Sequence, residues 1–327
     1  MSQRAVVVAA LAALIASILL IGVALIFWRF ERDVEAAEDR VADGSTLIAT
    51  RCGPIEYQEA GAGVPLLSVH GSGGGYDQGM ALAAPLARRG IRVIAMSRFG
   101  YLRTPMPADA SAAAQADAHV CLLDALGIQR AAVMGSSAGA PSALQMAIRH
   151  PERVGALVLL VPLTYKPPTQ AGSAAPLPPW VEAAMMRTIG SDFLFWSALH
   201  VARTRLIGSV LATPPDLLKT ASAAERDRVD TMLDDILPVS ARAAGLRSDT
   251  AAGKHLAPAP LESIRAPTLV ISASDDRYGT FAGAQYTAAR IPGARFIGFD
   301  EGGHTLVGHE DEVMAAIVTL LVASDRP

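Results

Sequence analysis

The sequence predicts an α/β protein in which a mostly parallel sheet is covered by helices on both faces. Three observations support this fold class. Short apolar runs alternate with longer helical patterns from about residue 47 onward. Residues 162–263 interrupt this alternation and carry only helical patterns. A Gly-x-Ser-x-Gly motif at residues 135–139 lies between a predicted strand and a predicted helix.

The composition excludes several classes of protein. Of the 327 residues, 51% are hydrophobic and 18% are charged, which excludes a disordered chain. The net charge of −3 gives no indication of a nucleic-acid partner. Cys52 and Cys121 are too few for a disulfide scaffold or a four-cysteine zinc site. They allow either one disulfide or two free thiols.

Residues 5–28 form one uncharged apolar run that is long enough to cross a membrane. The run has 24 residues, AVVVAALAALIASILLIGVALIFW, whereas a spanning helix needs about 20. Trp28 and Phe30 lie at its end, where aromatic residues of a membrane interface are expected. A buried core helix fits less well because the run has no polar face. The sequence therefore predicts a transmembrane anchor over residues 1–30.

A cleaved signal peptide is the alternative to an anchor. The apolar region of a signal peptide usually has about 7–15 residues, fewer than this run. A small-residue cleavage site would have to use Val34, Glu35 and Ala36, in a charged stretch well beyond the run. We therefore expect an uncleaved anchor in a bacterial inner membrane, with the lipid bilayer as partner through residues 5–28.

Two patterns disagree about the side of the membrane on which the domain lies. Arg29, Arg32 and Arg40 come after the run, and the positive-inside rule would keep them in the cytoplasm. The short tail before the run carries only Arg4, a layout typical of an anchor that exports the domain attached to it. We expect the domain outside the cytoplasm, against the cation count. Residues 31–46 are charged and small, and we interpret them as a linker that is partly helical.

The elements of the core follow from apolar runs of strand length and from helical periodicity. The predicted strands are 55–59, 64–69, 91–96, 131–134, 154–161, 268–272 and 295–299. The predicted helices are 77–89, 111–126, 138–149, 281–291 and 310–322. These elements assign residues 47–161 and 264–327 to the core.

Residues 162–263 contain no strand signal and are predicted to form a helical cap. The segment opens with six prolines between residues 162 and 179. A loop of this length without secondary structure is uncommon in a compact domain. Helical patterns follow over 180–189, 192–211, 216–220 and 223–237.

Ser137 is the candidate nucleophile. It is the central serine of Gly135-Ser136-Ser137-Ala138-Gly139, which directly follows the predicted strand 131–134 and opens the predicted helix 138–149. In this strand–turn–helix setting a serine hydroxyl projects above the sheet. A plain glycine-rich turn is the alternative.

A serine nucleophile needs a base that takes its proton, and histidine commonly serves. Of the seven histidines, only His304 lies on a glycine-flanked loop after a late predicted strand. His309 is the rival, although it lies where the last helix is predicted to begin. The third group should be a carboxylate that orients the imidazole, and Asp275 and Asp276 both follow the predicted strand 268–272. A turn is the alternative explanation of this Ser-Asp-Asp sequence.

Backbone amides that hold a developing oxyanion are expected near residues 70–75. This segment, HGSGGG, follows the predicted strand 64–69. We expect the amide of Ala138 to act together with that of Ser72 or Gly73. A phosphate-binding loop is the alternative, but the Walker lysine is absent, and the segment does not convincingly match G-x-G-x-x-G with a following acid at the right distance.

Together these motifs resemble the α/β-hydrolase fold family of bacterial type. The chain order Ser137, Asp276, His304 is also that of the family. The resemblance spans residues 54–322 and implies a Ser–Asp–His triad that needs no metal and no cofactor. The matching segments are HGSGGG at 70–75, SRFGYLRT at 97–104, GSSAG at 135–139, HPERV at 150–154, SASDD at 272–276 and GGH at 302–304.

Two segments depart from the family pattern. The loop that commonly reads D-R-x-G-x-G-x-S has Ser97, Leu102 and Thr104 in place of Asp, Gly and Ser, which changes a structural loop rather than a catalytic position. The acid motif commonly reads G-x-x-D-x-x-x-P, and here it has alanine and threonine in place of glycine and proline. This alignment assigns the acid to Asp276 and leaves Asp275 as the alternative.

The resemblance implies a serine hydrolase. Dehalogenases and epoxide hydrolases of this fold carry aspartate at the nucleophile position, so Ser137 argues against both. We expect a carboxylesterase-like enzyme that cleaves a carboxylic ester or thioester of a small apolar molecule through an acyl-enzyme. A C–C bond hydrolase, an acyltransferase and a non-catalytic binding protein of the same fold are the alternatives.

Bulky apolar residues of the cap are candidates for the wall of a substrate pocket. Trp180, Met185, Phe193 and Trp196 are the residues that we select. Packing within the core of the cap is the alternative for these side chains. A small-molecule substrate is the expected partner, nucleic acid is not, and the sequence gives no oligomeric state.

Overall fold

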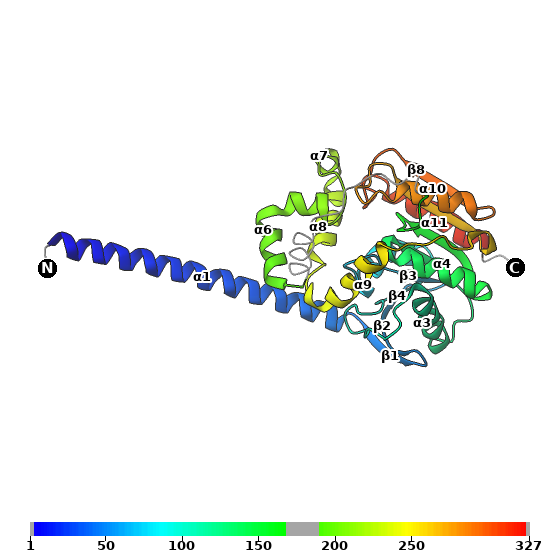
Figure 1. The fold of residues 1–327 in the computed structure, drawn as a ribbon, viewed down its shortest axis with the longest axis horizontal. Helices are drawn as coiled ribbons and strands as arrows, with labels where there is room; N and C mark the ends of the chain where they lie inside the picture. The colour runs from blue at the N-terminus through cyan, green and yellow to red at the C-terminus, as the bar shows by residue number, and fades with distance from the viewer. Residues whose placement is uncertain (1–2, 168–189, 325–327) are drawn as a thin grey trace.

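The computed structural model describes residues 3–167 and 190–324, and its domain is built on one eight-stranded sheet (Figure 1). The strand order is β1-β2-β4-β3-β5-β6-β7-β8. β2 pairs antiparallel with β1 and β4, and all other neighbours are parallel. This confirms the predicted fold class. The strands are β1 (Thr46–Thr50), β2 (Gly53–Ala60), β3 (Val64–Val69), β4 (Ile91–Met96), β5 (Ala131–Ser136), β6 (Val154–Leu160), β7 (Thr268–Ala273) and β8 (Arg295–Phe299).

Helices cover both faces of the sheet, which explains why its central strands are apolar at nearly every position. Successive side chains of a strand point to opposite faces. Leu66 therefore packs in the hydrophobic cluster under α2 and α11, whereas Leu67 packs in the cluster under α3, α4 and α10. These helices are α2 (Tyr76–Ala87), α3 (Ala112–Ala125), α4 (Ala140–Arg149), α10 (Phe281–Arg290) and α11 (Glu310–Ser324).

The strand β1 is an element that the sequence did not predict. It has five residues, lies at the edge of the sheet and pairs only with β2. None of its side chains is fully buried, so the sequence lacks the apolar run that marks the inner strands. The hairpin turn after β1 is joined to α3 by a disulfide between Cys52 and Cys121, whose Cα atoms are 6.0 Å apart. Of the two options that the sequence left open for the cysteines, the structure has the disulfide.

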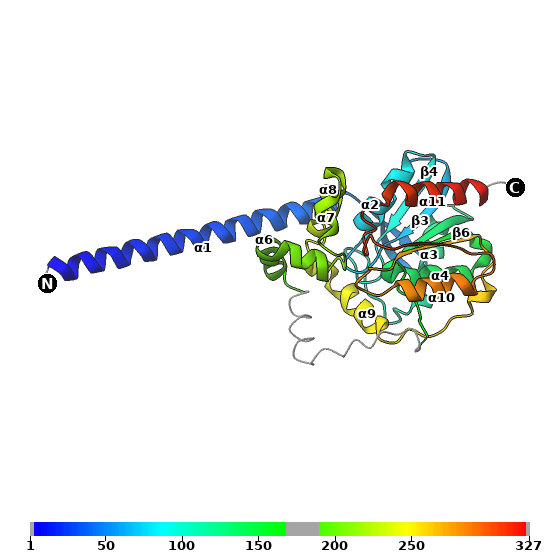
Figure 2. The same cartoon turned by 90° about the horizontal axis from the view of Figure 1, so that it is seen from above.

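The apolar run lies in one continuous helix, α1 (Gln3–Asp43), which extends away from the domain (Figures 1 and 2). At about 1.5 Å per residue its 41 residues span about 60 Å. The helix does not stop where the apolar run ends, so residues 31–43 are helical throughout. Ala37 and Val41, four residues apart, form the buried contact with the domain. Two small apolar residues in a charged stretch are too weak a pattern to predict a docked helix.

Within the described residues, four helices of the cap lie on the side of the domain from which α1 extends (Figure 1). Their buried side chains form a separate hydrophobic cluster that includes Phe195, Leu199 and Leu233. The cluster also contains Ala37 of α1 and Val307 of the core, so it joins the cap to both. The predicted helix 180–189 lies outside the described residues. The four helices are α6 (Asp192–Ser209), α7 (Leu217–Thr220), α8 (Ala223–Asp234) and α9 (Ala243–Gly253).

Candidate active site

Ser137 occupies the tight turn between β5 and α4, and its backbone is in the left-handed region with φ 48°. This conformation is unfavourable for a residue with a side chain, and it aims the serine away from the strand and the helix. The turn also brings the start of α4 against β3. A Cβ atom on Gly139 would lie 2.5 Å from the carbonyl oxygens of Val69 and His70. Glycine is therefore required at position 139.

His304 and Asp276 form a hydrogen-bonded pair at the carboxyl edge of the sheet. The Nδ1–H of His304 donates to Oδ2 of Asp276 at 2.8 Å. Asp276 follows β7 and His304 follows β8, so parallel neighbouring strands bring the two loops together. With Nδ1 engaged, Nε2 is the nitrogen of His304 that remains for a proton transfer.

The carboxyl group of Asp276 is fully buried and held in its ionised form. Burial opposes ionisation, but hydrogen bonds from His304, Thr280 and the backbone amide of Tyr278 outweigh it and lower the pKa of Asp276 below its usual value. A buried, ionised carboxylate stabilises the imidazolium that forms when His304 accepts a proton.

Asp275 has a different role from its neighbour. Its carboxylate accepts hydrogen bonds from the backbone amides of Gly302 at 3.2 Å and Gly303 at 2.8 Å. It thereby shapes the loop that carries His304 without touching the imidazole. Of the two carboxylates that the sequence left open, Asp276 is the one in contact with His304.

His309, the rival base, is engaged elsewhere. Its Nε2 lies 3.1 Å from the carbonyl oxygen of Glu301, and its ring stacks on Phe299 at 3.8 Å between centroids. Within residues 3–167 and 190–324, no hydrogen bond joins Ser137 to either histidine. Hydrogen bonds between catalytic groups are often long in ligand-free enzymes and tighten when substrate binds.

The loop 70–75, which carries the candidate oxyanion donors, packs directly against Ser137. A Cβ atom on Gly71 would lie 3.0 Å from the Cβ of Ser137. The amide of Gly73 lies 3.4 Å from the hydroxyl oxygen of Tyr101, whereas no turn or loop hydrogen bond among the described residues occupies the amides of Ser72 and Ala138. Of the two candidate donors in this loop, the amide of Gly73 is thus engaged and that of Ser72 has no such hydrogen bond among the described residues.

A buried ion pair between core and cap holds this loop in place. Nη1 and Nη2 of Arg98 bind the two carboxylate oxygens of Asp249 in α9 at 2.8 and 2.7 Å. The guanidinium also donates to the carbonyl oxygens of His70 at 2.9 Å and Gly71 at 3.1 Å. Asp249 further accepts a hydrogen bond from Ser72 Oγ at 2.8 Å. Helix α9 of the cap is thus joined to the candidate oxyanion loop directly through Ser72 and indirectly through Arg98.

The sequence did not single out Asp249. It lies 151 residues from Arg98 in the chain, in a helix without a motif, so only the folded chain brings the two together. Burial opposes ionisation of Asp249, but Arg98 outweighs it and lowers the pKa of this carboxyl. The pair is therefore ionised on both sides and neutral as a whole.

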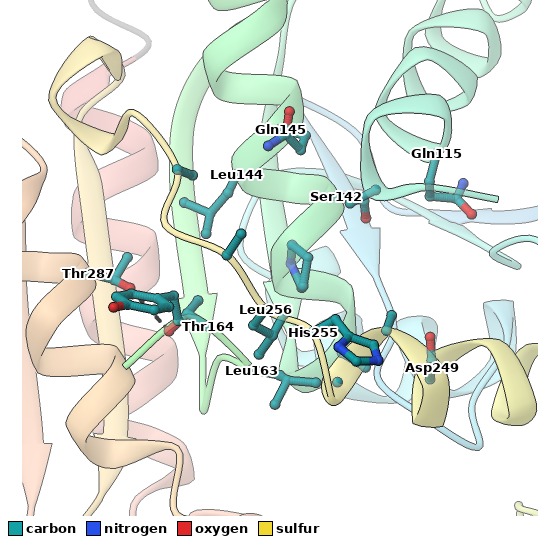
Figure 3. A pocket seen from close by; sticks show the side chains of 18 of the residues that line it. Gln115, Ser142, Leu144, Gln145, Leu163, Thr164, Asp249, His255, Leu256 and Thr287 are labelled. Carbon is teal, nitrogen blue, oxygen red and sulfur yellow. Dashed lines mark hydrogen bonds between the residues drawn. The ribbon is translucent and has the colours of Figure 1, made fainter. Parts of the chain in front are cut away.

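A cavity of about 440 Å³ lies beside the amino-terminal end of α4 (Figure 3). Ala138, the residue after Ser137, is part of its wall, whereas Ser137, Asp276 and His304 do not line it. Leu163, Leu256 and His255 approach α4 from the opposite side of the cavity (Figure 3). Among the described residues, Arg98 is the only lysine or arginine in the wall, and its charge is neutralised by Asp249. The cavity suits an uncharged, largely apolar group.

The candidate pocket residues of the cap lie elsewhere or outside the described residues. Phe193 and Trp196 pack against α1, where Phe193 stacks on Phe27 at 5.3 Å and Trp196 Nε1 donates to Asp33 at 3.0 Å. Neither lines the cavity beside α4. Trp180 and Met185 fall in the segment that is not described. Within the described ranges, no group of three or more His, Cys, Asp or Glu side chains is arranged to hold a metal ion.

Comparison with known proteins identifies the family. Residues 64–309 match the family model of the alpha/beta hydrolase fold, which is more than half of the chain. The chain belongs to the α/β-hydrolase fold family. An α/β hydrolase fold protein from Nakamurella multipartita has a TM-score of 0.70 and 28% sequence identity, over 85% of this chain and 99% of that one. A membrane phospholipase A, titled a novel bacterial virulence factor, has a TM-score of 0.64 at 20% identity, covers all of both chains and shows the fold alone.

Curated relatives of this α/β hydrolase are themselves named hydrolases. The 2-hydroxymuconate semialdehyde hydrolase of Pseudomonas sp. (strain CF600) is 43% identical over 106 residues, which are 31% of this chain and 38% of that protein. A 2-hydroxy-6-oxononadienedioate/2-hydroxy-6-oxononatrienedioate hydrolase from Pseudomonas putida is 28% identical over 264 residues, which are 76% of this chain and 85% of that protein. The chain thus matches about two fifths of the first relative. These likenesses support hydrolase activity.

Proposed function

We propose that this α/β hydrolase is a serine hydrolase that cleaves a carboxylic ester or thioester of a small apolar substrate through an acyl-enzyme. The observation that carries the proposal is the arrangement at the carboxyl edge of the sheet. Ser137 stands at a strained turn, and the His304–Asp276 pair follows the strands β7 and β8 of the same sheet. The two residues that such chemistry needs beside the serine are thus hydrogen-bonded to each other.

Each group has a defined role in the proposed reaction. His304 Nε2 takes the proton of Ser137 Oγ as that oxygen attacks the carbonyl carbon. The backbone amides of Ala138 and Ser72 hold the oxyanion, and Gly73 is the alternative to Ser72. The leaving alcohol or thiol departs with the proton from His304. Water, activated by the same histidine, then releases the acid and regenerates Ser137.

The cavity beside α4 supports an uncharged substrate. Its wall includes Ala138, whose amide is a proposed oxyanion donor, and its volume of about 440 Å³ would hold the acyl group. An anionic acyl group would have to share Arg98 with Asp249, because no other lysine or arginine lines the described wall. A buried carboxylate without a cation of its own is unfavourable.

Hydrolysis of a C–C bond is the second candidate, and the names of the relatives favour it. Those proteins are named for 2-hydroxymuconate semialdehyde and for 2-hydroxy-6-oxo dienedioates. The same serine, histidine and oxyanion donors would serve such a substrate. Acyl transfer to an alcohol is a variant of the first candidate.

Paired substrates distinguish the two reactions. The purified full-length protein and its Ser137→Ala variant are assayed with a series of p-nitrophenyl esters of increasing acyl length and with a 2-hydroxy-6-oxo dienoate. We expect Ser137-dependent turnover of the esters, highest for apolar acyl groups of moderate length. Turnover of the dienoate alone would replace the proposal by the second candidate. Product analysis with an added alcohol separates transfer from hydrolysis.

We further propose that α1 anchors the enzyme in a membrane and that its domain lies outside the cytoplasm. Among the described residues, α1 is the one helix long and apolar enough to span a bilayer, and the 18-residue window that qualifies it is not buried. The Cys52–Cys121 disulfide supports an oxidising compartment. Alkylation of denatured protein taken directly from cells tests this, since both thiols should be blocked until a reductant is added. Two free thiols in the untreated protein would contradict the proposed side.

A further inference from the structure

The cap helix α6 is the described element of the domain that lies nearest to the apolar run of α1, in both views (Figures 1 and 2). The first half of α6 runs across the direction of α1 in Figure 1. Phe27, the penultimate residue of the apolar run, stacks on Phe193 at 5.3 Å. Phe30 meets the edges of Phe193 at 5.1 Å and Trp196 at 5.8 Å. These contacts fix α6 at the level where the proposed span ends.

The faces of α6 can be assigned from its contacts, at about 100° of rotation per residue. Phe193 and Trp196 face α1. Phe195 and Leu199 point into the hydrophobic cluster of the cap. The side of α6 opposite this cluster carries Leu194 and Val201, and we call it the outer face of α6. Residues seven apart lie on one side of a helix.

The outer face of α6 is apolar and exposed. Leu194 is 47% exposed and Val201 is 85% exposed, the highest value among the large exposed hydrophobic residues described. Asp192 at the first turn is the only acid of α6, and its carboxylate accepts a hydrogen bond from the amide of Ser240. The outer face thus presents two exposed apolar side chains, and such side chains are more stable in a membrane interface than in water.

The orientation of this face follows from the packing of the helix. The domain lies on the cluster side of α6, and α1 lies beside it. The remaining side, that of Leu194 and Val201, therefore points back along α1 towards the apolar run. In a membrane that contains residues 5–28, this is the direction of the bilayer surface.

Further contacts between α1 and the domain restrain the domain from pivoting away from that surface. They are made by residues of α1 that come after those in contact with α6. Arg40 donates to Oδ2 of Asp77 at 3.0 Å and to the carbonyl oxygen of Leu237 at 2.8 Å. The hydroxyl of Tyr76 donates to the carbonyl oxygen of Val41 at 3.0 Å. A continuous helix with these contacts holds the cap at a set height above the span.

We propose that the outer face of α6 rests in the boundary between lipid headgroups and acyl chains, so that the cap is held on the bilayer and takes its substrate from it. The occupant is a lipid bilayer, continuous with the one that surrounds α1. This inference rests on the anchoring proposed above, and it adds the lipid surface as the source of the apolar ester substrate.

Depth-dependent quenching tests the contact directly. Val201→Cys and Val322→Cys variants of the full-length protein are labelled with an environment-sensitive dye and placed singly in nanodiscs of phosphatidylethanolamine and phosphatidylglycerol. Val322 is the control, since it is 46% exposed on α11 near the distant carboxyl end (Figure 2). We expect shallow spin-labelled lipids to quench the dye at position 201 severalfold more than that at 322. Equal quenching would overturn the proposal, and so would a signal that appears only with two copies per disc, which would indicate a second protomer.

Turnover separates this inference from the proposed activity. In a double variant, Leu194→Glu and Val201→Glu, we expect a severalfold loss of turnover of a long-chain ester presented in vesicles. Turnover of a short soluble ester should stay unchanged, as it should for both substrates in Val322→Glu. Unchanged turnover of the vesicle ester in the double variant would contradict the docking. Lack of ester turnover in the unmodified protein would instead contradict the proposed function. The quenching experiment would then decide on its own whether the outer face of α6 contacts the bilayer.

Discussion

The guanidinium of Arg98 and the carboxylate of Asp249 form a two-point ion pair at 2.7 and 2.8 Å, with both side chains nearly buried. This pair joins the core to the cap at the loop that carries the proposed oxyanion donors. Removing one partner of a buried pair leaves the other charge without compensation, which costs far more than breaking a surface pair.

We therefore predict that Asp249→Asn lowers the free energy of unfolding by about 3 kcal/mol, because Arg98 keeps its charge in a buried site. Urea unfolding followed by tryptophan fluorescence measures the change. Asp216→Asn is the matched control, because Asp216 pairs with Lys219 at 2.6 Å on the exposed surface. Its substitution should leave the free energy of unfolding nearly unchanged, because water screens an exposed pair. Equal effects of the two substitutions would show that the Arg98–Asp249 pair does not stabilise the fold.

The two neighbouring carboxylates should have unequal effects on catalysis. Asp276→Asn removes the anion that orients His304 and stabilises its cation, so kcat should fall by about 10³–10⁴-fold with the fold intact. Asp275→Asn keeps a hydrogen-bond acceptor near the amides of Gly302 and Gly303, so its loss should be far smaller. Steady-state kinetics of both variants, with the ester that the unmodified protein hydrolyses fastest, measures the two losses in kcat. The reverse order would assign Asp275 as the triad acid.

Gly139→Ala should destabilise the nucleophile turn. The added Cβ would lie 2.5 Å from two backbone carbonyl oxygens, which cannot move aside as a side chain can. We expect a loss of at least about 2 kcal/mol in unfolding free energy together with loss of turnover. Gly253→Ala is the control, because its Cβ would meet only Leu163 Cδ2 at an ordinary 3.6 Å. A Gly139→Ala protein as stable and active as the control would contradict the close packing of α4 on β3.

The carboxylate of Asp77 should stabilise the folded protein at neutral pH, and this contribution should be lost at low pH. Burial opposes its ionisation, but Arg242 and Arg40 outweigh burial and lower the pKa of Asp77 from 3.8 to about 2. A carboxyl whose pKa is lower in the folded state stabilises the fold above its unfolded pKa, and this contribution disappears as pH falls from about 4 to about 2. The difference corresponds to about 2 kcal/mol. In Asp77→Asn, unfolding free energy should therefore vary less steeply with pH over this interval, and an unchanged slope in urea titrations would refute the assignment.

Local signals in the sequence predicted most of the core. The strands β3 to β8 and the turn at Ser137 are marked by apolar runs and by glycines at fixed spacing. The sequence did not reveal features that depend on contacts between distant segments. The edge strand β1 has no buried side chain, and the docking of α1 depends on Ala37, Val41 and Arg40 within a charged stretch. Phe193 and Trp196 were candidates for a pocket wall, but a bulky aromatic residue packs equally well on α1, and spacing cannot distinguish the two sites.

We predict that Ser137 is an activated nucleophile, on which the proposed reaction depends. Labelling of the detergent-solubilised full-length protein with a fluorophosphonate tests it most directly, because this probe reacts with serines that a neighbouring base activates. Mass spectrometry of the digested protein locates the modified residue. We predict modification at Ser137, abolished in His304→Ala. Modification of a different serine, or none in protein shown to be folded, would contradict it.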